Sequence, residues 1–172
     1  LDVTGQRSDG YHTLKMIMQT VDICDVLTIK LLKEKKISIF SNKKITNNVE
    51  ENIVYKAAEL FLKETNLNCG VEIYILKNIP MGAGMAGGSA DAAGTLIGLN
   101  KLNNNILSEK KLEELCLRLG ADVPFCLRKG ACLCEGIGEQ MTEICKMEKV
   151  WLLVAKPDFS VSTPLVYKKF KR

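Results

Sequence analysis

The segment PMGAGMAGGSAD, residues 80–91, has the residue types and spacing that most directly indicate chemistry. It contains Gly82, Gly84 and Gly87 in the order G-x-G-x-x-G. Glycine permits positive φ and lets a ligand approach the backbone, and consecutive amide N–H groups in such a loop can surround an anion. A helix with Ser89 as its N-cap would add the positive end of its dipole. The segment therefore favours a phosphate-binding loop, with a tightly packed turn of small residues as the alternative.

Three familiar phosphate loops do not fit this segment. A P-loop needs a lysine after its last glycine, and here Ser89 follows Gly88 directly. A dinucleotide-binding fold needs a second strand with an acidic end about 20 residues further on. Residues 102–115 indicate a loop and a helix there instead, with Glu109 at the start of that helix. A protein kinase needs H-R-D and D-F-G sequences downstream, and the chain contains neither.

Asp122 is a second candidate for chemistry. It lies between Gly120, which we expect to follow a helix as its C′ residue, and Pro124. This places its carboxylate in a rigid loop from which it can face a cleft. An ordinary turn aspartate is the alternative interpretation.

The composition argues against several classes of partner. The chain has seven cysteines, no C-x-x-C pair and one histidine, so we predict no metal site built from protein ligands. Cys132 and Cys134 are spaced to fill a core from one face of a strand, and unpaired thiols indicate a reducing compartment such as a cytosol. A net charge of +4 and 6% aromatic residues argue against nucleic acid as a partner. No apolar run reaches 18 residues, which argues against a membrane.

The elements that must position these residues follow from periodicity and capping. Period-2 patterns predict strands, and apolar stripes behind Asn52 and Ser108 as N-caps predict helices. The expected strands are 25–33, 37–40 as its hairpin partner, 70–77, 131–135 and 149–155, and the expected helices are 53–65, 89–100 and 108–119. Strands and helices do not alternate strictly along the chain, so we predict an α+β fold.

Three further stretches, together with the glycine loop, resemble the GHMP kinase superfamily of small-molecule kinases. They read TGQRSDGYHTL from Thr4, LGADVPF from Leu119 and ACLCEGIGE from Ala131. The resemblance covers essentially the whole chain. It implies the N-terminal domain of that superfamily, which is ribosomal-protein-like, with a left-handed βαβ crossover and a two-layer arrangement of sheet and helices. It further implies transfer of phosphate from ATP to the 2-hydroxyl of 4-diphosphocytidyl-2-C-methyl-D-erythritol, in the non-mevalonate isoprenoid pathway.

The resemblance also implies roles for individual residues. Asp122 is the catalytic acid/base, Tyr11 and His12 bind the cytidine of the substrate, and Thr163 lies near the substrate. Asn52 and Lys77 line the nucleotide pocket, although Lys77 is also explained as a solvated lysine at the end of a strand. ATP with Mg²⁺ is the implied cofactor, and no protein ligand is assigned to the ion. The loop for the ATP phosphates comprises Pro80, Met81, Gly82, Ala83, Gly84, Met85, Ala86, Gly87, Gly88, Ser89 and Ala90.

The chain departs from the family pattern in two ways. Ala86 and Ala90 stand where relatives usually carry glycine and serine, and Ala86 fits if its φ is negative. The family's first strand is missing, so we expect an ATP-binding domain over residues 1–163 and, over 164–172, the start of a connection to an absent C-terminal domain. Such a fragment is expected to be a severely impaired enzyme of a bacterial cytoplasm, or alternatively of a plastid-type organelle. The alternatives are another kinase of the superfamily, of the mevalonate or homoserine type, and a non-catalytic nucleotide-binding fragment.

Overall fold

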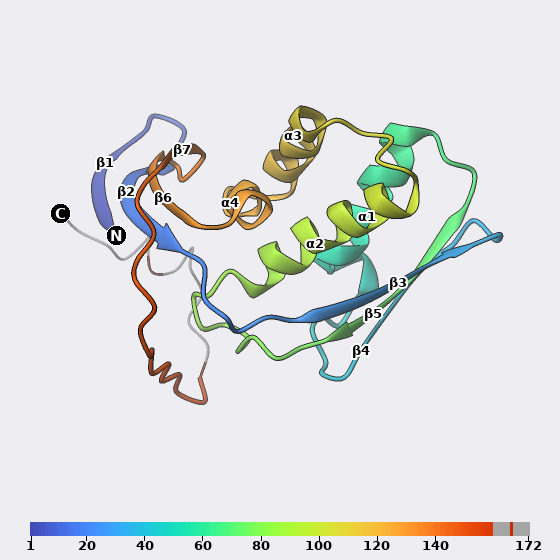
Figure 1. Cartoon of the computed structure of the whole chain (residues 1–172), viewed down its shortest axis with the longest axis horizontal. Coiled ribbons are helices and arrows are strands. Elements are labelled where there is room, and N and C mark those ends of the chain that lie inside the picture. Colours follow the sequence, from blue (N-terminus) through green and yellow to red (C-terminus); the bar gives the residue numbers. More distant parts are fainter. Residues whose placement is uncertain (160–165, 167–172) are drawn as a thin grey trace.

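The computed structural model describes residues 1–159 and residue 166. The described part contains two sheets and four α-helices (Figure 1). The strands are β1 (Asp2–Gln6), β2 (His12–Gln19), β3 (Val26–Leu32), β4 (Ile37–Ser41), β5 (Gly70–Leu76), β6 (Ala131–Gly136) and β7 (Gln140–Glu143). The helices are α1 (Ile53–Thr65), α2 (Gly87–Leu102), α3 (Glu109–Leu119) and α4 (Val123–Arg128), with one 3₁₀ turn at Val49–Glu51. The α+β prediction is confirmed.

One sheet has the strand order β3-β5-β4. β3 runs antiparallel to β5, whereas β4 runs parallel to β5 and is joined to it through α1. The predicted hairpin between residues 25–33 and 37–40 is therefore wrong, because β5 lies between these two strands. A parallel pair needs a crossover connection, which α1 supplies. The handedness of this crossover stays a prediction.

The other sheet has the order β1-β2-β6-β7 and is antiparallel throughout. Cys132 and Cys134 are buried on one face of β6, as predicted, and pack with Phe125 of α4. β7 was not expected from the sequence. The strand predicted over residues 149–155 is wrong, because this segment has no regular secondary structure in the described chain.

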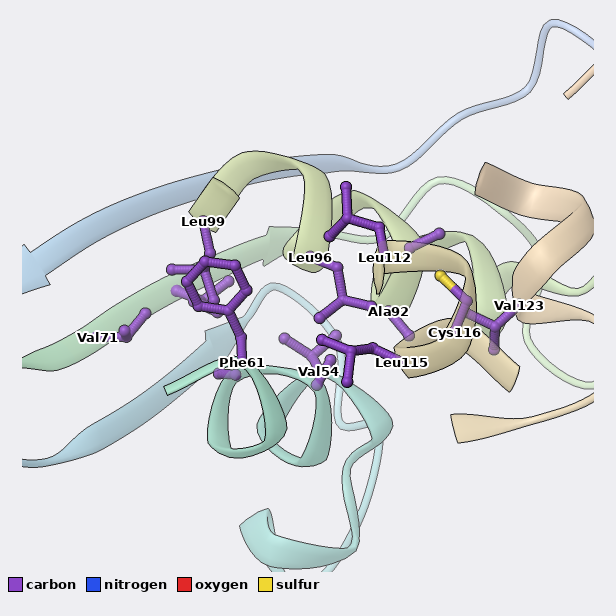
Figure 2. Packing of buried hydrophobic residues seen from close by; sticks show 14 of the residues in the cluster. Val54, Phe61, Val71, Ala92, Leu96, Leu99, Leu112, Leu115, Cys116 and Val123 are labelled. Carbon is purple, nitrogen blue, oxygen red and sulfur yellow. The ribbon is translucent and has the colours of Figure 1, made fainter. Parts of the chain in front are cut away.

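The main core lies between the three-stranded sheet and the helices (Figure 2). Figure 2 shows Phe61 and Val54 of α1 meeting Leu96 of α2 and Leu115 of α3. The predicted buried stripes of α1 and α3 are confirmed in their main members, including Val54, Phe61, Leu112, Leu115 and Cys116. In Figure 1, α1 and α2 lie above the β3-β5-β4 sheet and α3 and α4 lie toward the four-stranded sheet.

The helix starts were predicted correctly at two positions. Asn52 accepts a hydrogen bond from Val54 N at 2.9 Å, and Ser108 accepts one from Lys111 N at 3.3 Å. The third start is wrong: α2 begins at Gly87, so Ser89 is its third residue and Ala86 is its N-cap. Among the described residues, none of the helices is long and apolar enough to cross a membrane.

The segment after α3 also differs from expectation. Gly120 ends α3 with extended backbone at φ 163°, so it is not a left-handed C′ glycine. Asp122 is not in a loop before a turn at Pro124; it is the N-cap residue of the short helix α4. Proline is tolerated in the first turn of a helix because the N–H it lacks there has no intrahelical partner, so Pro124 is compatible with α4.

Candidate nucleotide site

In the loop between β5 and α2, every second residue from Gly82 to Ala86 has a positive φ. Gly82 has φ 66°, Gly84 has φ 68° and Ala86 has φ 51°, whereas Ala83 and Met85 between them have no positive φ. Left-handed residues that recur along a loop can turn backbone N–H groups toward one side, as in an anion-binding nest. We expected Ala86 to fit the loop with a negative φ, and this expectation is wrong. The position is left-handed, which explains why glycine suits it better than alanine does.

The start of α2 continues this arrangement. Ala86 provides no side-chain cap, and the first helical hydrogen bond runs from Ala90 N to Ala86 O at 2.9 Å. The amide groups of Gly87, Gly88 and Ser89 therefore belong to the turn whose donors have no intrahelical acceptor. Residues 80–86 form the loop, and residues 87–90 form the first turn of the helix, so the segment predicted as a phosphate loop lies in one continuous stretch.

A hollow lies next to Asn52, the N-cap residue of α1. Asn52 is 5% exposed, and the following residue, Ile53, lies against Gly88: a Cβ added at Gly88 would be 3.6 Å from Ile53 Cγ2. The hollow has a volume of about 180 Å³. Its lining combines apolar, hydroxyl and amide side chains with one lysine: Ile39, Ser41, Lys44, Ile45, Thr46, Asn47, Val49 and Asn52. Such a lining suits a flat heterocycle with polar edges.

Lys77 is buried beneath the loop, which excludes the solvated alternative. Its side chain is 4% exposed, and its ammonium contacts the carboxylates of Asp25 and of Asp91, the latter at 2.8 Å. Asp25 also accepts hydrogen bonds from the backbone N–H groups of Asn78 and Ile79, at 2.6 and 2.8 Å. A contact between Lys77 and a nucleotide stays a prediction.

The three charged groups shift one another's proton affinities. Burial raises the pKa of Asp91 to about 6, even though the hydrogen bond from Lys77 opposes this. Burial acts on Asp25 as well, but its hydrogen bonds from Lys77 and from two backbone N–H groups outweigh burial and lower its pKa. The pKa of Lys77 is raised because its two carboxylate partners outweigh the effect of burial. At neutral pH the group therefore holds two negative charges and one positive charge.

Asp122 is a desolvated carboxylate. Burial raises its pKa, and it makes no side-chain hydrogen bond to the N–H groups of α4. Cys126, one turn further along α4, has its pKa raised to about 11 by burial and by the charges of Asp122 and Asp91. Cys126 is therefore close enough to both carboxylates to feel their charges. Since α2 and α4 pack together, Cys126 lies between the helix that carries Asp91 and the residue that precedes α4, Asp122.

Tyr11 and His12 lie at the start of β2, away from the loop along the chain. Tyr11 is 62% exposed. Four residues further along β2, Met16 lies near the turn at Gly138: a Cβ added at Gly138 would be 3.2 Å from Met16 Cε and 3.9 Å from the Cβ of Ala121, the residue before Asp122. Thr163 lies outside the described residues, as do the last residues of the expected connection at 164–172 apart from residue 166.

The sequence analysis did not identify Asp25 and Asp91 as members of the site. One signal was available for Asp91, because a charged residue followed by Ala-Ala and an apolar helix face needs a buried partner. Over the residues that the structure describes, no group of three or more His, Cys, Asp or Glu side chains is arranged to hold a metal ion.

Residues 52–130 match the family described as GHMP kinases N terminal domain, and the chain has the fold of that domain. It is 47% identical over 170 residues to the 4-diphosphocytidyl-2-C-methyl-D-erythritol kinase of Clostridium beijerinckii, covering 99% of this chain and 60% of that protein. It is 51% identical over 167 residues to the enzyme of the same name from Clostridium perfringens, covering 97% of this chain and 58% of that protein.

A solved structure gives the same relationship. The crystal structure of a 4-(cytidine 5'-diphospho)-2C-methyl-D-erythritol kinase superposes with a TM-score of 0.76 at 31% identity, covering 96% of this chain and 58% of that one. The chain thus spans about 60% of the length of the curated relatives it matches.

Proposed function

We propose that this chain is the nucleotide-binding N-terminal domain of a kinase that transfers phosphate from ATP to the 2-hydroxyl of 4-diphosphocytidyl-2-C-methyl-D-erythritol. The similarity to kinases of that name over nearly the whole chain supports the substrate. The alternating φ angles of Gly82, Gly84 and Ala86, leading into an uncapped helix N-terminus, are the single observation that carries the nucleotide role.

The nucleotide is proposed to extend from the loop to the hollow beside Asn52. The phosphates would meet the N–H groups of the loop and of the first turn of α2. The base would enter the hollow, because Asn52 of its lining precedes Ile53, whose Cγ2 would be 3.6 Å from a Cβ added at Gly88. We propose that Mg²⁺ accompanies ATP, held by phosphate oxygens and water as this small, hard ion prefers.

Asp122 is proposed to act on the acceptor hydroxyl. Phosphoryl transfer has a loose transition state, so the carboxylate mainly orients the hydroxyl and accepts its proton late. A desolvated carboxylate with a raised pKa is a better proton acceptor than an exposed one. Tyr11 and His12 would bind the cytidine by stacking and by a hydrogen bond to its edge.

The curated relatives named above come from bacteria, which supports a bacterial cytoplasm as the proposed location over an organelle. A mevalonate or homoserine kinase is the alternative within the superfamily. A binding panel decides between them: saturable binding of the cytidine-containing substrate, and none of mevalonate or homoserine, is expected.

The test of the nucleotide role is ATP binding measured by calorimetry on the wild-type chain and on Gly84→Ala. A Cβ at Gly84 has no atom within 4 Å, so the substitution acts only through its positive φ. Alanine in this conformation costs about 1–2 kcal/mol, so affinity for ATP should fall roughly tenfold. Gly10→Ala is the matched control, because Gly10 has φ 87°, open space and a position outside the loop. Equal ATP affinities in the two variants, or no saturable binding by the wild type, would refute the nucleotide role.

A further inference from the structure

The buried group of Lys77, Asp25 and Asp91 ties three segments together beneath the loop. Asp25 precedes β3, Lys77 follows β5, and Asp91 is in α2 one turn after Gly87. All three side chains are at most 4% exposed. The Lys77 ammonium is also next to the first residue of α2, because a Cβ added at Gly87 would be 3.4 Å from Lys77 Nζ.

The charges of this group do not balance. Two carboxylates share one ammonium, and Lys77 is the one cation within 4 Å of either carboxylate among the described residues. From the packed elements, the titratable groups that face Asp91 are Lys77, Asp25 and Cys126 of α4. An ionised Asp91 thus leaves one uncompensated negative charge directly behind the amide groups that the proposed function assigns to phosphate.

We propose that Asp91 is a positioning residue of the phosphate loop whose proton affinity is coupled to the nucleotide, so that the phosphates bind together with a proton taken up by Asp91. The proposal rests on the proposed function, since it needs an anion at the loop. Lys77, held by Asp25 and Asp91, then supports the loop from behind.

The direction of the coupling follows from electrostatics. An anion above Gly87 repels the Asp91 carboxylate and favours its neutral form. Because the pKa of Asp91 is about 6 without ligand, a bound phosphate chain raises it toward neutral pH. A rise of one unit makes binding about tenfold tighter below pH 6 than above pH 8, and near pH 6.5 takes up roughly half a proton.

The experiment measures ATP binding calorimetrically from pH 5.5 to 8.5, in two buffers of different ionisation enthalpy, so that protons are counted. Asp91→Asn keeps an oxygen for Lys77 and removes the titrating group. ATP's own protonation is the same for both proteins, so the difference isolates Asp91. We expect the variant to bind ATP at pH 8 about tenfold more tightly than the wild type, with about half a proton less uptake near pH 6.5.

Asp25→Asn provides an independent variant. Its amide oxygen can still accept from Asn78 and Ile79, and Asp91 alone then neutralises Lys77, so the extra proton uptake should also disappear. Glu113→Gln is the control, because Glu113 lies in an exposed ion pair with Arg128. This variant should bind ATP with the same affinity and proton uptake as the wild type.

Each outcome has one meaning. Saturable ATP binding with equal proton uptake in the wild type, Asp91→Asn and Asp25→Asn would overturn this inference and leave the proposed function standing. No ATP binding by the wild type at any pH would refute the proposed function, and this inference with it. A purely structural role of Asp91 would change thermal stability without changing the number of protons taken up.

Discussion

At the scale of single residues, the burial of Asp122 suits a proton acceptor but lowers the stability of the folded protein when the carboxylate is ionised. Burial raises its pKa, so the folded state binds a proton at Asp122 more tightly than the unfolded state does. Its contribution to stability is therefore fully present below the unfolded pKa and is lost as pH rises through the folded value. Asp122→Asn should raise the melting temperature at pH 7.5, because the amide has no charge to desolvate. The gain should vanish near pH 3.5, as scanning calorimetry at both pH values would show.

Asp9→Asn is the control for that comparison. Asp9 is exposed, and its hydrogen bonds from Arg7 and from Tyr11 N lower its pKa. Its negative charge therefore favours the folded state, whereas the negative charge of Asp122 opposes it. Removing its charge should not stabilise the protein at pH 7.5. If Asp122→Asn melted at or below the wild-type temperature at that pH, Asp122 would have an electrostatic partner in the folded protein.

Ala86 marks the limit of sequence reasoning at this scale. The G-x-G-x-x-G spacing favoured a phosphate-binding loop, and the family resemblance supplied its residues 80–90. The conformation of Ala86 did not follow, because its φ is set by where β5 ends and where α2 must begin. The same cause moved the helix start from Ser89 to Gly87. Local residue types predict that a loop binds an anion, whereas the flanking elements decide which of its residues are left-handed.

At the scale of elements, Gly70 controls how β5 enters its sheet. A Cβ at this position would lie 2.0 Å from Glu34 O and 2.4 Å from Lys36 O, both backbone atoms of the connection between β3 and β4. Backbone cannot move aside as a flexible side chain does, so Gly70→Ala should destabilise the fold by about 3 kcal/mol or more. Chemical denaturation measures the loss in the free energy of unfolding. An unchanged m-value shows that the variant exposes the same surface on unfolding as the wild type.

Gly120→Ala is the matched substitution for Gly70→Ala. A Cβ there meets only Val123 Cγ2 at 3.6 Å, and the backbone is extended, so a change well below 1 kcal/mol is expected. Equal losses of stability in the two variants would mean that the general cost of replacing glycine, and not the backbone contact at Gly70, determines the effect.

The elements were easier to predict than their partners. Period-2 and period-3.6 patterns located β3, β5, β6, α1 and α3 because each buries one face against the core. The patterns do not say which strand pairs with which, so β4 was assigned to β3 although it lies beside β5. The six-residue helix α4 is too short for a periodic signal, and Pro124 indicated a turn as readily as a first helical turn.

At the scale of the whole molecule, the group under the loop depends on three segments that are distant in sequence. Asp25, Lys77 and Asp91 meet because β3 and β5 are neighbours and α2 covers their ends. Each residue has an ordinary local explanation, and only the assembled fold brings two carboxylates to one ammonium. The candidate site is therefore predictable where it is one continuous loop, and unpredictable where it depends on tertiary contacts.

At this scale, residues 149–155, KVWLLVA, form an apolar segment that is exposed. Six of the seven are apolar, which predicted a strand, yet no described strand pairs with them. Trp151 is 103% exposed and Leu153 is 97% exposed. Since Trp151 is the only tryptophan, its fluorescence reports on this segment alone. In dilute solution it should emit at the long wavelength of hydrated indole and be quenched by acrylamide nearly as fast as in guanidinium. Slow quenching at every concentration would contradict this exposure, and a shift to shorter wavelength only as concentration rises would show that copies of the chain cover the segment.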